Sequence, residues 1–187
     1  ALMLKVLDDA FGVEEGSFTS VHAYTSDQSL TDVPTQGDLR RSRAAMQNIV
    51  PQTTWTDEAV EELFPHLKGK FKGIKLNVPV AEVSCSDLTV QMKRPVKASE
   101  VNEVFRSASQ TILKGVLDFT DQPIVSSDMN GNPASCLFDS LATLVTDDVL
   151  LKVIGWYEQG GGISNRIVDL ISQVGPQSTT SGDRRTS

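Results

Sequence analysis

The stretch SVHAYTSDQSLTD, residues 20–32, carries residue types that could do chemistry. His22 lies within a strand-like run, and small polar residues and the acid Asp27 follow it. A histidine can serve as a general base because its imidazole titrates near neutral pH. A lone histidine in a strand is more often a packed structural residue. The residues alone therefore leave both interpretations of His22 open.

The chain also contains two cysteines, Cys85 and Cys136. Cys85 lies in an alternating segment, and Cys136 lies beside Phe138 in an apolar run. Free cysteine in such surroundings is commonly buried and unreactive, because burial raises the thiol pKa. No Cys or His spacing typical of a metal site occurs, so the sequence predicts no metal. Isolated cysteines are typical of a reducing cytoplasm.

Composition limits the class of protein. The 187 residues are 39% hydrophobic and 22% charged, which is typical of a soluble globular domain. The formal net charge of −7 at pH 7 argues against a nucleic-acid partner. No apolar run reaches the ~18 residues of a membrane span, and no signal peptide is recognisable. We therefore expect a cytoplasmic protein with no nucleic-acid or membrane partner.

Periodicity and turn residues predict the elements that position these side chains. Residues 1–11 form an apolar helix that Gly12 ends, and no capping residue precedes it, so we expect residue 1 to be a cut. Further helices are predicted at 54–67, 98–113 and 164–174. Strands are predicted at 18–25, 71–78, 82–92, 123–129, 135–138, 141–146 and 149–157.

The connections between these elements are also informative. The polar segment 26–52 is over twice the length of a usual connection, which indicates a functional or interface loop. The Asn130-Gly131 step predicts a hairpin, and the polar residues 175–187 are predicted to be disordered. Because strands and helices do not alternate regularly, the fold class is predicted as α+β with a mainly antiparallel sheet.

Six segments, taken in order, carry a family resemblance: LKVLDDAFGV, SVHAYTSDQSLTD, DLRRSRAAMQNIVP, VSCSDLTVQMKRP, LKGVLDFTDQPIVSSDMNG and GWYEQGGGISNRIVDL. In combination they resemble the catalytic domain of glyceraldehyde-3-phosphate dehydrogenase and of its relative erythrose-4-phosphate dehydrogenase. The resemblance runs from residue 1 to about residue 174.

The resemblance implies how the protein is organised. Residues 1–174 would be the catalytic and oligomerisation domain, a mixed sheet with helices on one face, lacking the nucleotide-binding domain that precedes it in the family. That absent domain would bind most of the NAD or NADP. Segment 26–52 would be the S-loop, which lines a neighbouring subunit's cofactor site in a homotetramer, and helix 164–174 would pack on the nucleotide-binding domain. The nucleophilic cysteine would lie about six residues before Ala1.

The resemblance also assigns the reacting and substrate-binding residues. His22 matches the catalytic base, which takes the proton of the thiol. Thr25, Asp27 and Arg41 match residues that hold the substrate phosphate, a role for which hydroxyls and guanidinium groups are suited. A salt-bridged loop is the alternative for Arg41. Thr54 matches the site of inorganic phosphate near a helix N-terminus, and its alternative is a plain helix cap.

Several pocket positions depart from the family pattern. Asn77 stands where the family has a second arginine on the substrate phosphate, and Lys75, on the same strand face, offers partial compensation. Trp55 replaces a glycine beside the predicted anion site. Gln159 stands where an asparagine holds the nicotinamide amide, and the glycines at 160–162 are expected to make that segment flexible.

Together these features predict the catalytic-domain portion of an NAD(P)-dependent phosphorylating aldehyde dehydrogenase. Its substrate would be a sugar-phosphate aldehyde such as glyceraldehyde 3-phosphate, and the oxidoreductase would serve glycolysis. The full-length protein would be an enzyme, whereas the fragment alone would be inactive because it lacks the nucleophile. The departures leave open a second hypothesis, a degenerate non-catalytic relative that serves as an assembly or regulatory module.

Overall fold

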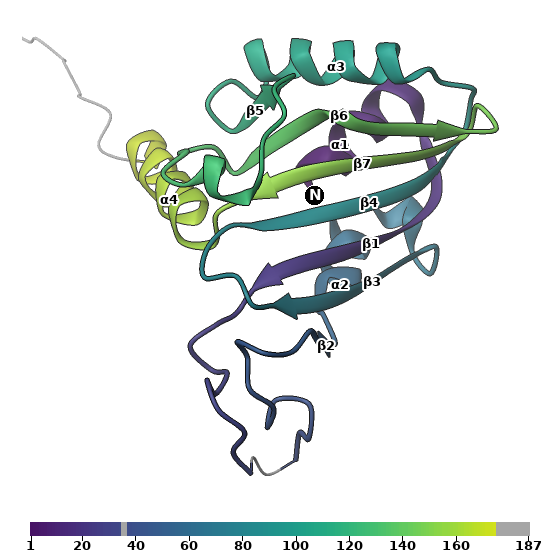
Figure 1. Cartoon of the computed structure of the whole chain (residues 1–187). Helices are drawn as coiled ribbons and strands as arrows, with labels where there is room; N and C mark the ends of the chain where they lie inside the picture. Colours follow the sequence, from purple (N-terminus) through teal and green to yellow (C-terminus); the bar gives the residue numbers. More distant parts are fainter. Residues whose placement is uncertain (35–36, 175–187) are drawn as a thin grey trace, which may run out of the picture.

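The frame of the molecule is a seven-stranded mixed sheet, seen in a computed structural model that describes residues 1–34 and 37–174 (Figure 1). The strands are β1 Val13–Ala23, β2 Val50–Gln52, β3 Phe71–Val78, β4 Ser84–Met92, β5 Leu117–Thr120, β6 Cys136–Thr146 and β7 Leu150–Tyr157. They lie in the order β2-β3-β1-β4-β7-β6-β5. The pairs β1–β3 and β5–β6 are parallel, and the other neighbouring pairs are antiparallel. The predicted α+β class with a mainly antiparallel sheet is confirmed.

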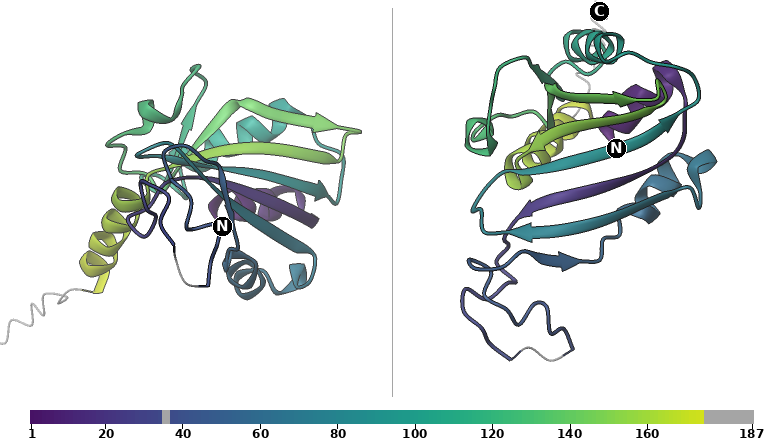
Figure 2. Two further views of the ribbon diagram at one scale, coloured as in Figure 1. Left: turned by 60° about the horizontal axis from the view of Figure 1, so that its bottom comes forward. Right: turned by 45° about the vertical axis from the view of Figure 1, so that its right-hand side comes forward.

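Helices cover one face of this sheet (Figure 2). The helical elements are α1 Leu2–Phe11, α2 Thr56–Leu63, η1 Pro65–Leu67, α3 Ala98–Gln110, η2 Ser126–Met129 and α4 Gln159–Val174. Apolar residues of α1, α2 and α3 join a common core with the strands, whereas α4 projects away beyond the end of β7. None of the helices in the described ranges is long and apolar enough to cross a membrane.

The core fills the space between the sheet and the first three helices. Alternation along β4 and β7 turns Val90 and Leu151 toward the helices, where both are fully buried with Leu7 of α1. Phe105 of α3 stacks on Phe138 of β6 with ring centroids 3.7 Å apart. Burying an apolar side chain of this size stabilises the fold by roughly 1.5–3 kcal/mol.

The region between α3 and β7 corrects several predictions. The strand predicted at 123–129 is wrong, because Ser126–Met129 forms the 3-10 turn η2. Asp128 Oδ2 accepts a hydrogen bond from the Val125 amide at 2.8 Å and closes this turn. The hairpin predicted at Asn130-Gly131 is also wrong, since that step joins η2 to β6. The two strands predicted at 135–146 form one strand, β6, with a register shift between Asp139 and Leu144.

Other boundaries differ for simple physical reasons. Helix α2 ends at Leu63 rather than residue 67, because Pro65 cannot donate its amide and begins η1 instead. Helix α4 begins at Gln159 rather than residue 164 and includes the glycines at 160–162, so the predicted flexible segment is helical. The edge strands β2 and β5 were not predicted, since three and four residues are too short for a clear period.

The predicted loop 26–52 leaves the end of β1 and returns to the sheet edge, and its last three residues form β2 (Figure 1). Side chains organise part of it: Asp32 Oδ1 accepts from the Ala44 amide at 2.8 Å, and the Ala45 amide donates to the Ser29 carbonyl at 2.9 Å. The tail predicted to be disordered, 175–187, lies outside the described residues.

Candidate active site

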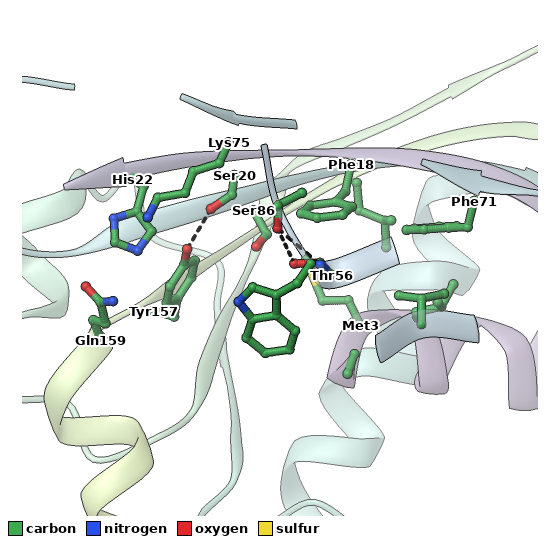
Figure 3. Close-up of a pocket in the computed structure, with 16 residues that line it drawn as sticks. Met3, Phe18, Ser20, His22, Thr56, Phe71, Lys75, Ser86, Tyr157 and Gln159 are labelled. Atoms are coloured by element: carbon green, nitrogen blue, oxygen red, sulfur yellow. Dashed lines mark hydrogen bonds between the residues drawn. The ribbon is translucent and has the colours of Figure 1, made fainter. Parts of the chain in front are cut away.

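A cavity of about 280 Å³ lies on the helix-covered face of the sheet, where β1, β3, β4 and β7 meet the start of α1 and α2 (Figure 3). The strand register brings its polar side chains to one level. Ser20 of β1 pairs with Lys75 of β3 on one side and with Ser86 of β4 on the other. His22 follows two residues later on the same face.

His22 is held in a defined orientation at one end of this cavity. The side chain is only 6% exposed, and its Nδ1 lies 2.6 Å from the carbonyl oxygen of Ala23. A carbonyl can only accept, so Nδ1 carries a proton and the neutral ring keeps its lone pair on Nε2. The ring also meets Tyr157 edge to face, with centroids 6.2 Å apart. This arrangement leaves Nε2 as the basic atom.

The surroundings of His22 favour this neutral form. Burial lowers the pKa of His22 below its ordinary value, and the positive charge of Lys75 lowers it further. The carbonyl of Ala23 and the carboxylate of Asp27 act in the opposite direction. At neutral pH the imidazole is therefore ready to accept a proton, as a general base must be.

Hydroxyl groups line the rest of the cavity. Ser20 Oγ and Tyr157 OH are hydrogen-bonded at 2.7 Å, and Figure 3 shows this pair beside the His22 ring. Thr54 Oγ1 lies 2.7 Å from Thr56 Oγ1 and accepts from the Thr56 amide at 3.2 Å. These groups can donate hydrogen bonds to an oxygen-rich ligand.

Comparison with known proteins places this chain in a family. Residues 1–159 match the family model described as "Glyceraldehyde 3-phosphate dehydrogenase, C-terminal domain". The chain belongs to the glyceraldehyde-3-phosphate dehydrogenase family. It is 49% identical over 174 residues to "Glyceraldehyde-3-phosphate dehydrogenase 2" of Bacillus subtilis, which is 93% of this chain and 51% of the relative. It is 48% identical over 177 residues to "Glyceraldehyde-3-phosphate dehydrogenase 2" of Streptomyces avermitilis, which is 95% of this chain and 52% of the relative. The chain thus spans about half the length of these curated relatives.

The residues that the family resemblance singles out fall into two groups in space. His22, Thr54 and Gln159 all line the cavity. Thr25, Asp27 and Arg41 do not line it, and instead bind one another in the loop after β1. Arg41 contacts Asp27 at 3.1 Å and Asp38 at 3.4 Å, so its guanidinium group is bound by two carboxylates of this loop, and its role in phosphate binding stays a prediction.

Asn77, which stands at the family's second arginine position, is a structural amide. It is 1% exposed, and its Nδ2 donates to Oε1 of Gln28. Gln28 Oε1 also accepts from the Thr25 amide at 3.2 Å. Asn77 therefore ties β3 to the turn after β1 and is absent from the cavity lining.

The structure shows the surroundings of two other positions that depart from the family pattern, Trp55 and the glycines at 160–162. The Trp55 indole is 75% exposed and forms part of the cavity rim, next to Thr54. Gly162 packs so closely on the start of β6 that a Cβ there would lie 3.3 Å from the Ser135 Cα. That contact explains a glycine at 162, whereas a Cβ at Gly160 would meet nothing within 4 Å.

Neither Cys85 nor Cys136 lines the cavity. Cys85 faces the opposite side of β4 from Ser86, and burial raises its thiol pKa. Cys136 is buried, and desolvation raises its pKa to about 12. Within residues 1–34 and 37–174, no three His, Cys, Asp or Glu side chains gather in a metal-binding arrangement.

Sequence reasoning had not assigned Ser20, Ser86 or Tyr157 to the site. Ser20 and Ser86 could have been found, because each lies two residues from another polar residue on the same strand face. Tyr157 could not, because its approach to Ser20 depends on the order of β1, β4 and β7 in the sheet.

Proposed function

We propose that this chain is the catalytic C-terminal portion of an NAD(P)-dependent phosphorylating aldehyde dehydrogenase that acts on glyceraldehyde 3-phosphate or a similar sugar-phosphate aldehyde. The observation that carries the proposal is the buried, neutral His22, whose Nδ1 is fixed on Ala23 in a hydroxyl-lined cavity. Family membership supports the reaction class. The relatives reported above are all named as dehydrogenases and give no support to a non-catalytic module.

In this proposal His22 moves the protons of the reaction. Its Nε2 accepts the proton of a cysteine thiol as the sulfur adds to the aldehyde carbonyl, and returns that proton to the carbonyl oxygen to give the hydroxyl of the hemithioacetal. It takes the same proton back when the hydride leaves the carbon. NAD(P), when bound, supplies the acceptor for the hydride that leaves the same carbon. Gln159 at the cavity rim has an amide that suits the nicotinamide amide, and Thr54 would hold the inorganic phosphate that attacks the thioester.

The direction of α1 supports a nucleophile that precedes this sequence. Ala1 and Met3 line the same cavity as His22. A cysteine about six residues before Ala1, as in the family pattern, would therefore emerge close to the imidazole. The isolated chain would be inactive, because Cys85 and Cys136 cannot replace that thiol from where they lie.

Two exposed surfaces support the proposed domain organisation. Helix α4 carries an exposed apolar stripe: Ile163, Ile167, Leu170, Ile171 and Val174. We assign this stripe to contact with a preceding nucleotide-binding domain. The loop 26–52 exposes Leu30, Leu39, Met46 and Ile49, which suits an S-loop that packs on a neighbouring subunit of a cytoplasmic homotetramer.

The test is an assay of the intact protein, isolated as its own source makes it. With glyceraldehyde 3-phosphate, NAD(P) and inorganic phosphate, it should form NAD(P)H, whereas residues 1–187 alone should form none. Absence of turnover with phosphorylated aldehydes, in a protein shown to bind NAD(P), would favour the degenerate relative. Turnover by the isolated chain would contradict the proposed source of the nucleophile.

A further inference from the structure

The charge of the cavity is opposite to that of the chain. The protein has 24 Asp and Glu residues against 17 Lys and Arg residues. Yet the cavity lining, all of it within the described residues, contains the ammonium group of Lys75 and no carboxylate. The hydroxyl groups of Ser20, Ser86, Thr54 and Tyr157 surround the same space. A cation among neutral donors is an arrangement that binds anions.

The Lys75 side chain is held in this position without a partner. It is half-buried, and Figure 3 shows it extending beside His22. Across residues 1–34 and 37–174, no side chain forms a hydrogen bond or an ion pair with its ammonium group. Burial lowers the Lys75 pKa, and Asp27 partly offsets this effect from beyond ion-pair distance. An incoming anion would therefore meet an ammonium whose charge is not already neutralised by contact.

Other cations near the site are already engaged. Arg41 contacts the carboxylates of Asp27 and Asp38 and lies outside the cavity lining. Lys72 lies on the same strand as Lys75 but is absent from the cavity lining, and its ammonium group contacts Asp57 of α2 at 3.4 Å. A cation in an ion pair must leave or share its carboxylate partner before it can bind a ligand. Arg41 and Lys72 are therefore weaker anion receptors than Lys75.

We infer that Lys75 is the substrate-specificity residue of this cavity, the cation that binds the phosphate of a phosphomonoester aldehyde. This inference rests on the proposed function and names the group that selects the substrate. A phosphomonoester carries close to two negative charges at neutral pH. Ser20 is the cross-strand neighbour of Lys75, and the hydrogen-bonded pair of Ser20 and Tyr157 keeps one hydroxyl proton that it can donate to the same phosphate.

The test measures binding rather than turnover, in the intact protein without NAD(P). Glycerol 3-phosphate is the probe, with glycerol as its uncharged counterpart, and calorimetry gives the Kd. Lys75→Met should raise the Kd about tenfold to a hundredfold, because it removes a charge-assisted contact. Lys72→Met is the matched control, since it removes the same charge from a residue of β3 that does not line the cavity, and its Kd should stay within about twofold. Lys75→Arg should retain binding, because it keeps the positive charge. A melting temperature of Lys75→Met close to that of the wild-type protein would show that its loss of binding is not misfolding.

Distinct outcomes separate this inference from the proposed function. An unchanged Kd in Lys75→Met, a larger loss in Arg41→Met than in Lys75→Met, or no binding by the wild-type protein would each overturn the role of Lys75. Binding that depends on Lys75, in a protein that oxidises no phosphorylated aldehyde, would support the anion site and contradict only the proposed reaction.

Discussion

One face of one sheet supports two different environments in this protein. At one end, Leu88 and Val90 of β4 lie opposite Val153 and Leu151 of β7 in a closed apolar core. At the other end, the same strands continue with Ser86 and Tyr157, and β1 continues with Ser20 and His22. The change from apolar to polar occurs within two residues on β1 and β4 and within four residues on β7.

The comparison shows how stability and chemistry are divided. The apolar end is packed by α1 and α3 and should dominate the free energy of unfolding. The polar end is supported by the same strands, so its side chains are held in place by a rigid scaffold. Changes at the apolar end should therefore alter stability, and changes at the polar end should alter activity.

His22→Gln should have the largest effect, and on activity alone. Loss of the general base should lower kcat for aldehyde oxidation by about 10²–10⁴-fold, with little change in thermal stability. His66→Gln is the matched control, because His66 lies outside the cavity, 3.2 Å from Asp8. Steady-state kinetics of both variants of the intact protein would settle the point. Equal losses in the two variants would show that His22 has no special role.

Phe138→Ala, at the apolar end, should lower stability rather than act directly on catalysis. Phe138 is fully buried between Phe105 and Phe119, so its truncation should lower the free energy of unfolding by about 3–5 kcal/mol. Leu141→Ala, on the same strand but exposed, should cost less than about 0.5 kcal/mol. Chemical denaturation of the intact protein measures both. Similar losses for the two would contradict the assignment of the core.

The pH dependence of stability should reveal the buried histidine. The pKa of His22 is lowered in the folded protein, so the unfolded chain binds more protons near pH 6. Stability should therefore fall as the pH drops below about 6.5, the ordinary histidine value, and keep falling until the pH passes the folded-state pKa. His22→Gln should remove this part of the loss. Histidine NMR titration that placed the His22 midpoint above 6.5 would reverse the sign.

Trp55→Gly should have the smallest effect on stability. Its indole is largely exposed at the cavity rim, so the free energy of unfolding should change by less than about 0.5 kcal/mol. The smaller residue should also lower the KM for inorganic phosphate, because it opens the approach to Thr54. A loss of more than about 2 kcal/mol would place Trp55 in the packing of α2 rather than at the rim.

The sequence predicted the elements with a clear local pattern and the residues that the family resemblance covers. Strand β3 was predicted at its observed bounds, and α1 and the alternating segment of β4 were predicted within a few residues, because their periods are clear. The turn at Ser126–Met129 was missed, because Asp128 stabilises it through a side-chain contact that competes with a strand.

The family resemblance pointed to His22, Thr54 and Gln159, and the fold brings these three residues to one cavity, while their roles stay predictions. It could not show that Arg41 is held by Asp27 and Asp38. It could not show that Asn77 is bound by Gln28 either. These contacts depend on how the loop after β1 folds back onto the sheet. The spacing of apolar residues in the sequence does not predict that conformation.

The most direct test of the account is a map of where a phosphomonoester binds. Backbone amide shifts of the intact, isotope-labelled protein would be followed by NMR as glycerol 3-phosphate is added. We predict that the perturbed amides cluster at the polar end of the sheet, around Ser20, His22, Lys75 and Tyr157, and that those of Val90 and Leu151 do not shift. Perturbations confined to the face of the sheet that carries no helix, or to the surface of α4, would contradict it.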